Sequence, residues 1–260
     1  MKAVFLSDAH LKSVADDRYG RLIEFLEEIK KGRIASLVDY EEAGADHVYI
    51  DDLFIAGDLF DFWFCRRDKI YPDFHLIIEK LVELKKTGVR IHLFEGNHDF
   101  FMKEYFHDVL DMAVFEECAQ LELDGKKVFI AHGDTADEGD KMYKIFRKFL
   151  RSRAFYRLQR FIPAPVLWAI AGLSSAASKE LNKENGDELF EKMSSFALDR
   201  LHEDCDAVIL GHSHQAVLQK YQIEGRDKTF VALGDWINHY SFLYLEDGKF
   251  ILSHYRPPCT

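Results

Sequence analysis

The stretch IAGDLFDFW, Ile55 to Trp63, decides the fold. It begins as an apolar strand and ends abruptly in a short acidic turn that contains Asp58 and Asp61. An apolar strand buried in an open α/β sheet delivers the residues after its carboxyl end to the crevice in which such sheets keep their sites. We therefore expect Asp58 to lie in a functional site.

Four other stretches share this design, a β-rich run that stops at Asp, Asn or His. They are VFLSDAH ending at His10, IHLFEGNHD ending at Asp99, VFIAHGD ending at Asp134 and VILGHSH ending at His214. The five stretches supply seven oxygen and imidazole donors, namely Asp8, His10, Asp58, Asn97, His132, His212 and His214. Singly, each has an ordinary explanation as a cap, a turn residue or a buried histidine. Seven buried polar groups at successive strand ends would be costly without an ion, so the sequence predicts a metal centre.

The number of donors favours two ions over one. Seven ligands exceed what one four-coordinate ion needs, and one bridging carboxylate would give each of two ions four protein ligands. Asp58 is the natural bridge, because it is the carboxylate at the centre of its motif. The imidazole, carboxylate and amide set has no sulfur and suits Mn²⁺, Fe, Co²⁺ or Zn²⁺. Two ions about 3.5–4 Å apart suit an in-line displacement at phosphorus.

The first hundred residues predict a parallel sheet. Lys2–Ser7, Asp52–Gly57 and Val89–Phe94 have the pattern of buried strands, and Tyr19–Lys31 and Asp73–Thr87 have helical periodicity. This β-α-β-α-β order favours parallel pairing with helices packed on the sheet. Between the first helix and the second strand, residues 34–47 are expected to form an excursion with a short helix.

Beyond Asn97 the pattern predicts antiparallel hairpins. Val114–Leu123 and Lys126–Ala131 flank the turn signal Asp124-Gly125. The tail repeats the pattern, with expected strands at Val208–Leu210, Val217–Ile223, Thr229–Leu233, Phe242–Leu245 and Phe250–His254. The simplest packing for this order is two mixed sheets face to face with helices outside.

Between these halves, Gly139–Glu203 is almost wholly helical in pattern. From Lys141 to Arg160 it carries eight Lys and Arg and no acid, and Phe161–Leu173 is then apolar. One interpretation is a helical hairpin whose basic face is merely solvated. The other is a lid whose cationic and apolar sides suit an anionic, acylated ligand or an anionic bilayer surface.

Composition excludes several classes of protein. The net charge of −11 argues against a general nucleic-acid binder, which needs a basic face. Four cysteines without a CxxC pair indicate a reducing compartment and no thiolate metal site. The first residues lack a secretory signal pattern, and the longest apolar stretch is shorter than the roughly 20 residues of a spanning helix. We therefore expect a cytoplasmic protein.

Five motifs, in this order along the chain, resemble the blocks of the calcineurin-like metallophosphoesterase superfamily: Asp8-x-His10, Gly57-Asp58-x-x-Asp61, Gly96-Asn97-His98-Asp99, His132-Gly133-Asp134 and Gly211-His212-x-His214. The resemblance implies one domain over residues 1–260, a four-layer αββα sandwich with a helical insertion at about 139–203. It places one ion on Asp8, His10, Asp58 and His214, and the other on Asp58, Asn97, His132 and His212. It also implies that His98 contacts the phosphate and protonates or stabilises the leaving oxygen, oriented by Asp99.

A narrower resemblance is to the UDP-2,3-diacylglucosamine pyrophosphatase family. It rests on GDLFDFW, NHDFF, the run from His132 to Thr135 with Asp140 and Tyr143 after it, Ser178-Lys-Glu-x-Asn182, and the late Leu233-Gly-Asp-Trp236. Such enzymes cleave a pyrophosphate in lipid A synthesis, usually with Mn²⁺, and yield UMP and an acylated sugar phosphate. The resemblance implies a lid over the acyl chains and substrate contacts from Asn97, His98, Asp140, Tyr143, Ser178, Asn182 and His212. For a cytoplasmic enzyme with such a lid, the sequence leaves open whether the lid contacts the anionic surface of the inner membrane or only the acyl chains.

The chain departs from that narrower family at several positions. The best-known members carry arginine where this chain has His98, and lid positions that are basic there fall on Ser175 and Asn185, with Lys179 and Lys183 nearby. The first alternative is thus a phosphodiesterase or phosphatase that acts on another nucleotide or lipid-linked phosphate. A nuclease is disfavoured because no long basic groove is evident outside the lid. A non-catalytic scaffold is disfavoured because all seven ligands are present.

Overall fold

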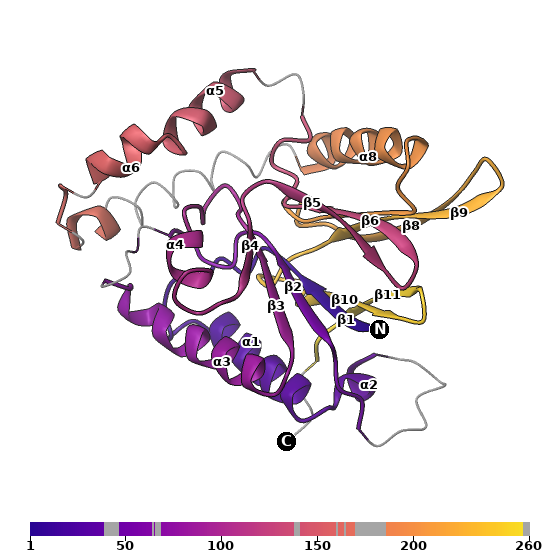
Figure 1. Cartoon of the computed structure of the whole chain (residues 1–260), viewed down its shortest axis with the longest axis horizontal. Coiled ribbons are helices and arrows are strands. Elements are labelled where there is room, and N and C mark those ends of the chain that lie inside the picture. Colours follow the sequence, from indigo (N-terminus) through magenta and orange to yellow (C-terminus); the bar gives the residue numbers. More distant parts are fainter. Residues whose placement is uncertain are drawn as a thin grey trace.

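Two β-sheets lie face to face in the middle of the molecule, and helices cover both outer faces (Figure 1). The computed structural model describes residues 1–38, 47–63, 65, 69–137, 141–159, 161–163, 165–169 and 186–256. The first sheet has the order β11 (Lys249–His254), β10 (Ser241–Glu246), β1 (Lys2–Leu6), β2 (Asp52–Ala56), β3 (Arg90–Phe94) and β4 (Ala113–Phe115). The second has the order β5 (Cys118–Leu123), β6 (Lys126–Ala131), β7 (Ala207–Leu210), β9 (Arg226–Leu233) and β8 (Ala216–Ile223). This mixed α/β sandwich confirms the predicted fold class.

The parallel half of the first sheet agrees with the sequence. Strands β1, β2, β3 and β4 run parallel, and β10 and β11 add an antiparallel edge beside β1. The crossover between β1 and β2 contains α1 (Asp17–Lys30) and α2 (Ile34–Leu37), and the next contains η1 (Pro72–Phe74) and α3 (His75–Lys86). The short helix α2 confirms the start of the expected excursion, of which residues 39–46 lie outside the described residues.

The prediction of antiparallel strands after Asn97 was wrong in two places. The expected strand Val114–Leu123 is two strands, because the chain leaves β4, which pairs in parallel with β3, and crosses through Glu116 and Glu117 to β5 in the other sheet. Strand β7 pairs in parallel with both β6 and β9. The physical reason is α8 (Gly186–His202), which carries the chain back from the end of β6 so that β7 starts at the same end of the sheet.

The core has three apolar layers, and strand alternation explains them. In β1, Ala3 and Phe5 pack between the sheets, whereas Val4 and Leu6 pack toward α1 and α3. Both faces of the strand are buried, so its sequence is continuously apolar. On the far side, α8 covers the second sheet, and its Met193, Ala197 and Leu201 are fully buried. Helix α8 is therefore an outer layer of the sandwich.

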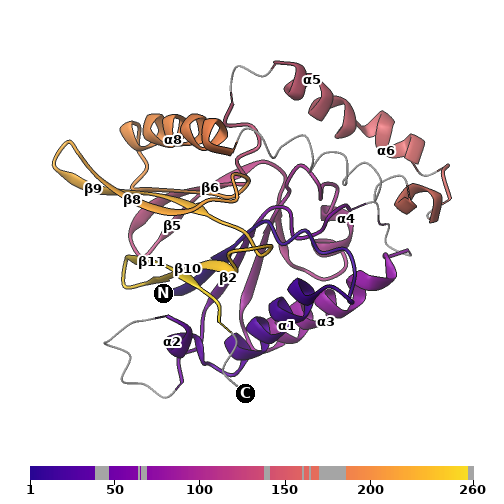
Figure 2. The ribbon, with the colours of Figure 1, turned by 180° about the vertical axis from the view of Figure 1, so that it is seen from behind.

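Helices α5 (Lys141–Leu150) and α6 (Arg153–Gln159) stand apart from the sheets, on the side that also carries the short α4 (Lys103–Phe106) (Figure 2). A further helical turn follows at residues 165–169. Several large apolar side chains on this segment are solvent-exposed: Met142, Ile145, Phe146, Phe149, Leu158, Phe161 and Val166. Among the helices that the structure describes, none has the length and apolar character needed to cross a bilayer.

Candidate metal centre

The expected ligands meet at one end of the molecule because they follow parallel strands. Asp8 and His10 follow β1, Asp58 follows β2 and Asn97 follows β3, all at the carboxyl edge of the first sheet. From the second sheet, His132 follows β6, and His212 and His214 follow β7. The candidate site therefore lies at the seam between the two sheets.

Five of the seven residues adopt a left-handed backbone conformation. The φ angles are 55° at Asp8, 46° at His10, 51° at Asp58, 67° at His212 and 57° at His214. Residues other than glycine adopt such angles rarely and at a cost of order 1–3 kcal/mol, and they cluster at functional sites. Strands β1, β2 and β7 thus end in sharp turns that redirect the polar side chains after them.

The glycines of the motifs let these loops approach each other closely. A Cβ atom on Gly96 would lie 2.1 Å from the Asp58 Oδ1, and one on Gly211 would lie 2.7 Å from the Asp8 Oδ2. On Gly57, whose φ is +91°, it would lie 2.5 Å from the His132 Nδ1. The motifs need glycine at all three positions for space, and at Gly57 also for its positive φ.

All seven side chains gather around Asp58. The Asp58 Oδ2 lies 3.6 Å from the His10 Nε2 and 3.4 Å from the His132 Nε2. On the His10 side, the His214 Nε2 lies 3.3 Å from the Asp8 Oδ1. On the His132 side, the His132 Nε2 lies 2.9 Å from the Asn97 Oδ1, and the His212 ring lies 4.9 Å from the His132 ring between centroids.

The donors form two overlapping groups, and Asp8 belongs to both. Donor atoms of Asp8, His10 and His214 lie within 4.8 Å of one another, as do those of Asp8, Asp58 and His132. Asp8 Oδ1 and both ring nitrogens of His10 are buried and have no hydrogen-bond partner within the described part of the chain. Buried polar atoms without partners are costly, and a divalent cation would satisfy them. The residues therefore fit a metal centre.

The electrostatics of the cluster also favour a cation. Burial opposes ionisation of Asp8, but the neighbouring His214 holds its pKa at about 2. Burial also opposes protonation of His132, yet the charge of Asp58 raises the pKa of His132 to about 10. Burial lowers the pKa of His10 to about 3 and that of His212 to about 4. The carboxylates are thus charged, and an incoming cation would displace the proton that they hold on His132.

His98 lies beside this cluster, but Asp99 does not contact its ring as expected. The Asp99 carboxylate is fully buried and accepts hydrogen bonds from the backbone N–H groups of Asp58, Phe60 and Gly96. The His98 Nδ1 instead lies 3.1 Å from the backbone oxygen of Asp61. Asp99 therefore fixes the turn that carries Asp58, and the Asp61 carbonyl orients the His98 ring.

Asp61 itself is a site residue that the sequence motifs contained but did not assign. Its carboxylate Oδ1 lies 3.8 Å from the His10 Nδ1, and donor atoms of Asp61, His10 and His98 lie within 4.8 Å of one another. A carboxylate beside the second nitrogen of a metal-binding histidine orients the ring. The acidic spacing Gly-Asp-x-x-Asp was the sequence signal for this position.

Tyr143 is the substrate-contact candidate on α5 that the structure describes, and its hydroxyl donates a hydrogen bond of 2.8 Å to Asp134. Asp134 is buried two residues after His132. The other candidates on this segment, Asp140, Ser178 and Asn182, lie outside the described residues, as do Ser175, Asn185, Lys179 and Lys183.

Known proteins resemble this chain over most of its length. UDP-2,3-diacylglucosamine hydrolase of Aeromonas salmonicida is 27% identical over 251 residues, which cover 96% of this chain and 91% of the relative. The protein of the same name from Stenotrophomonas maltophilia is 26% identical over 97% and 98% of the two chains. The one from Hamiltonella defensa is 32% identical over 66% of this chain and 68% of its own.

Among solved structures, an archaeal phosphodiesterase aligns with 97% of this chain and 98% of its own at 15% identity, with a TM-score of 0.47, so assignment to a family rests on the sequence comparisons. The model of the calcineurin-like phosphoesterase family matches residues 1–216, which include all seven expected ligands. The chain belongs to the calcineurin-like phosphoesterase family and is a metal-dependent phosphoester hydrolase.

Proposed function

We propose that the chain hydrolyses the pyrophosphate of UDP-2,3-diacylglucosamine to UMP and 2,3-diacylglucosamine 1-phosphate, a step of lipid A synthesis. The relatives that carry the name of this activity align over nearly the whole chain, including the helical segment between β6 and β7. We further propose Mn²⁺ as the native ion, with Fe, Co²⁺ and Zn²⁺ as ions that the same donors accept.

The proposal of an acylated substrate rests on the orientation of α5. An amphipathic helix of a globular protein usually turns its apolar face to the core. In α5 the polar side chains Tyr143 and Arg147 contact the body of the protein, whereas Ile145 and Phe149 are 64% and 58% exposed. An apolar face of this kind next to a phosphoesterase site suits the acyl chains of a lipid substrate.

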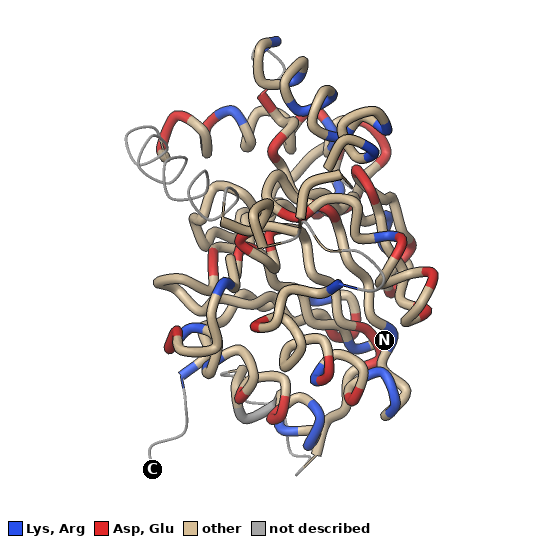
Figure 3. Tube along the Cα trace, turned by 90° about the vertical axis from the view of Figure 1, so that its left-hand side faces the viewer, with Lys and Arg blue, Asp and Glu red and all other residues tan. Residues whose placement is uncertain are grey.

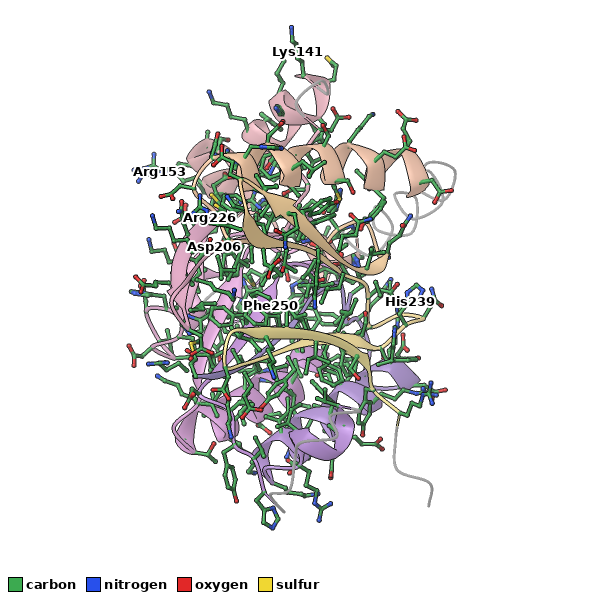
Figure 4. All side chains as sticks on the ribbon, turned by 90° about the vertical axis from the view of Figure 1, so that its right-hand side faces the viewer. Lys141, Arg153, Asp206, Arg226, His239 and Phe250 are labelled. Atoms are coloured by element: carbon green, nitrogen blue, oxygen red, sulfur yellow. The ribbon has the colours of Figure 1, made fainter. Side chains whose placement is uncertain are left out.

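The same segment supports a peripheral contact with an anionic membrane. Lys and Arg gather on α5 and α6 (Figure 3), and the Lys141 side chain extends away from the sheets (Figure 4). Basic residues next to exposed apolar side chains favour the surface of an anionic bilayer, each contributing roughly 1 kcal/mol near the surface. We propose that α5 and α6 face this surface, from which the substrate comes.

The proposed metal ligands are the seven donors described above, with Asp58 shared. Divalent ions bound there would neutralise the charge that develops on the phosphoryl oxygens and make water a better nucleophile. The chain itself supplies orientation, because Asp99 holds the Asp58 turn and the Asp58 Oδ1 accepts a hydrogen bond of 2.9 Å from the His98 N–H. Asn97, His98, Tyr143 and His212 are the proposed substrate contacts within the described residues, and the resemblance adds Asp140, Ser178 and Asn182.

His98 is the proposed group that acts on the leaving oxygen. A carbonyl only accepts hydrogen bonds, so the Asp61 carbonyl requires a proton on the His98 Nδ1 and leaves Nε2 for the substrate. In its charged form the ring can donate a proton from Nε2 to the oxygen that leaves phosphorus. No ligand contact ties His98 to the ions in this assignment, so its role separates from theirs.

Replacing His98 by alanine is expected to lower kcat about 100-fold, the scale of general acid catalysis, while both ions stay bound. The measurement pairs steady-state hydrolysis with a Mn²⁺ count on the purified variant. His107→Ala is the control, because His107 is exposed on the α4 side and makes its hydrogen bond with Asp108. Loss of ions together with activity would contradict the assigned role.

The substrate is tested by Mn²⁺-dependent release of UMP from UDP-2,3-diacylglucosamine, with bis-p-nitrophenyl phosphate and UDP-glucose assayed in parallel. We expect UMP release from the acylated substrate at a kcat/KM at least about 100-fold above that for UDP-glucose. Only the acylated substrate has acyl chains that can contact the apolar surface of α5. Equal rates on the two nucleotide sugars would overturn the lipid substrate. Hydrolysis of the generic diester alone would point to the alternative, another nucleotide or lipid-linked phosphate.

A further inference from the structure

The inner face of α5 and the turn directly after it carry two arginines that are almost buried. Arg147 lies in α5 and Arg151 directly follows its last residue, and the Arg151 N–H donates a hydrogen bond of 2.9 Å to the Arg147 carbonyl, so the two side chains project from the same side. Each side chain is only 12% exposed, unlike the solvated basic face that one interpretation of the sequence expected. Buried guanidinium groups need hydrogen-bond or ion-pair partners, and these partners identify the loops on which α5 packs.

Arg147 is fastened to the loop that carries His132. Its Nε donates a hydrogen bond of 2.7 Å to the Asp134 Oδ2, the oxygen that also accepts from Tyr143. Its NH1 donates a hydrogen bond of 2.9 Å to the Glu117 carboxylate, in the link between the two sheets. Asp134 is itself buried, so the ion pair between Arg147 and Asp134 is shielded from water.

Arg151 is fastened to the loop that carries Asn97. Its NH2 donates a hydrogen bond of 2.7 Å to the backbone oxygen of Gly96, the residue directly before Asn97. Its NH1 donates to the Glu116 carbonyl at 2.7 Å and lies 3.2 Å from the Glu95 Oε2. The guanidinium carbon lies 5.4 Å from the centre of the Phe100 ring, on the same loop.

From α5 and the turn directly after it, the two arginines therefore contact loops of both sheets. Arg147 contacts the loop after β6, and Arg151 contacts the loop after β3. Those loops hold Asn97 and His132, whose side chains lie 2.9 Å apart and form one half of the candidate metal centre. A displacement of α5 would move or release the loops on both sides of this half-site.

We propose that Arg147 and Arg151 form a clasp that couples the docking of α5 to the geometry of the Asn97–His132 half of the metal centre. They act as positioning residues, because neither contacts a proposed ligand atom. Loops aligned by the clasp present Asn97 and His132 at the correct spacing, so ion binding there needs less ordering. The proposal rests on the family's metal centre and not on which phosphate ester is cleaved.

Reciprocity follows from this coupling. If docking of α5 favours an ion at the half-site, an ion there favours docking of α5 by the same free energy. Occupancy of the metal centre would thus hold the apolar face of α5 in place, and an empty centre would leave α5 more often detached. Through the clasp, the docking of α5 depends on the metal.

The test measures Mn²⁺ binding by the whole chain, for instance from the electron paramagnetic resonance signal of the free ion. Arg147→Met and Arg151→Met keep the aliphatic stem and remove the guanidinium. Each is expected to raise the Kd of one of the two Mn²⁺ sites, the one that Asn97 and His132 would hold, about tenfold, the low end for loss of a residue that supports a ligand. Lys148→Met, a loss of the same charge from an exposed position of α5, is the control and is expected to leave the Kd unchanged.

The direction of the effect separates positioning from charge. Removing a positive group near a cation site would tighten Mn²⁺ binding if only charge mattered. Arg151→Lys keeps the charge but cannot reproduce the forked contact with two carbonyls and a carboxylate, so we expect it to weaken binding as well. Tighter binding in the methionine variants, or wild-type binding in Arg151→Lys, would overturn the clasp.

The double variant tests whether the arginines act as one unit. If both work through the docking of α5, the loss of either loosens the other, and the double variant weakens Mn²⁺ binding by far less than the roughly 100-fold product of two independent effects. Hydrogen exchange of residues 141–159 gives a second readout without catalysis. We expect added Mn²⁺ to slow exchange there in the wild type but not in the double variant.

Equal exchange with and without Mn²⁺ in the wild type would overturn the coupling. These outcomes are independent of the substrate assay. If UMP release fails but the arginine variants lose Mn²⁺ affinity, the role of the two arginines is supported and the proposed substrate is wrong. If UMP release succeeds and all variants bind Mn²⁺ like the wild type, the proposed substrate is supported and the role of the two arginines is wrong.

Discussion

Asp58→Asn is expected to abolish Mn²⁺ binding at both ions and to lower hydrolysis at least about 1,000-fold, since metal ions supply several kcal/mol of charge stabilisation. Asparagine keeps the size of the side chain and can still accept the hydrogen bond from the His98 N–H, so the turn is retained. The lost feature is the charge that lies between His10 and His132. Activity and bound Mn²⁺ are measured on the same sample.

The matched control is Asp52→Asn, because Asp52 is a buried carboxylate at the other end of the same strand. It pairs with Arg90 and His92, so its loss should lower the thermal midpoint and leave the turnover number within about twofold of the wild type. An Asp58→Asn enzyme that retained wild-type turnover would remove Asp58 from the centre of the mechanism.

Gly96→Ala is expected to have an effect of similar size although no polar side chain is replaced. The new Cβ atom would lie 2.1 Å from the Asp58 Oδ1 and 2.6 Å from the Asp58 backbone nitrogen. Both distances are far below van der Waals contact, so the Asp58 carboxylate must leave its position. Activity should therefore fall about 1,000-fold, as in Asp58→Asn. The clash itself should cost about 1–3 kcal/mol of unfolding free energy.

Gly20→Ala is the control for the added methyl group. Gly20 lies in α1, where a Cβ atom would meet nothing within 4 Å. Alanine there should raise the free energy of unfolding by about 0.5–1 kcal/mol, because glycine is a poor helix former. Circular dichroism spectra and diester hydrolysis are compared for the two variants. Wild-type activity in Gly96→Ala would mean that the Asp58 carboxylate tolerates displacement.

The location of the candidate site was predictable because it follows from strand order. An apolar run that ends in Asp, Asn or His places the polar residue at the edge of a sheet, and parallel strands bring such ends together. The structure therefore gathers Asp8, Asp58 and His214 although they are far apart in sequence. The left-handed backbone at these residues was not predictable, since it comes from loops packed closely against each other.

The misassigned details share a different cause. Local patterns indicate that a strand exists, but its direction depends on where the preceding connection begins and ends, so the parallel pairing of β7 was missed. The same limit applies to Arg147 and Arg151. A basic residue on an amphipathic helix is usually solvated, and only the tertiary structure shows that their side of α5 faces the protein. The contacts of Asp99 with the Asp58 turn are likewise tertiary.

The pairing of the first strand with a late one has a consequence for how the chain is made. In the first sheet Lys2 pairs with Glu246, so β1 gains its neighbour β10 only after residue 246 has been synthesised. Until then one edge of the nascent sheet is open, and His212 and His214 have not yet joined Asp8. The complete set of candidate ligands therefore comes together only after His214 has been synthesised, and the open edge of β1 can pair with other strands until β10 follows.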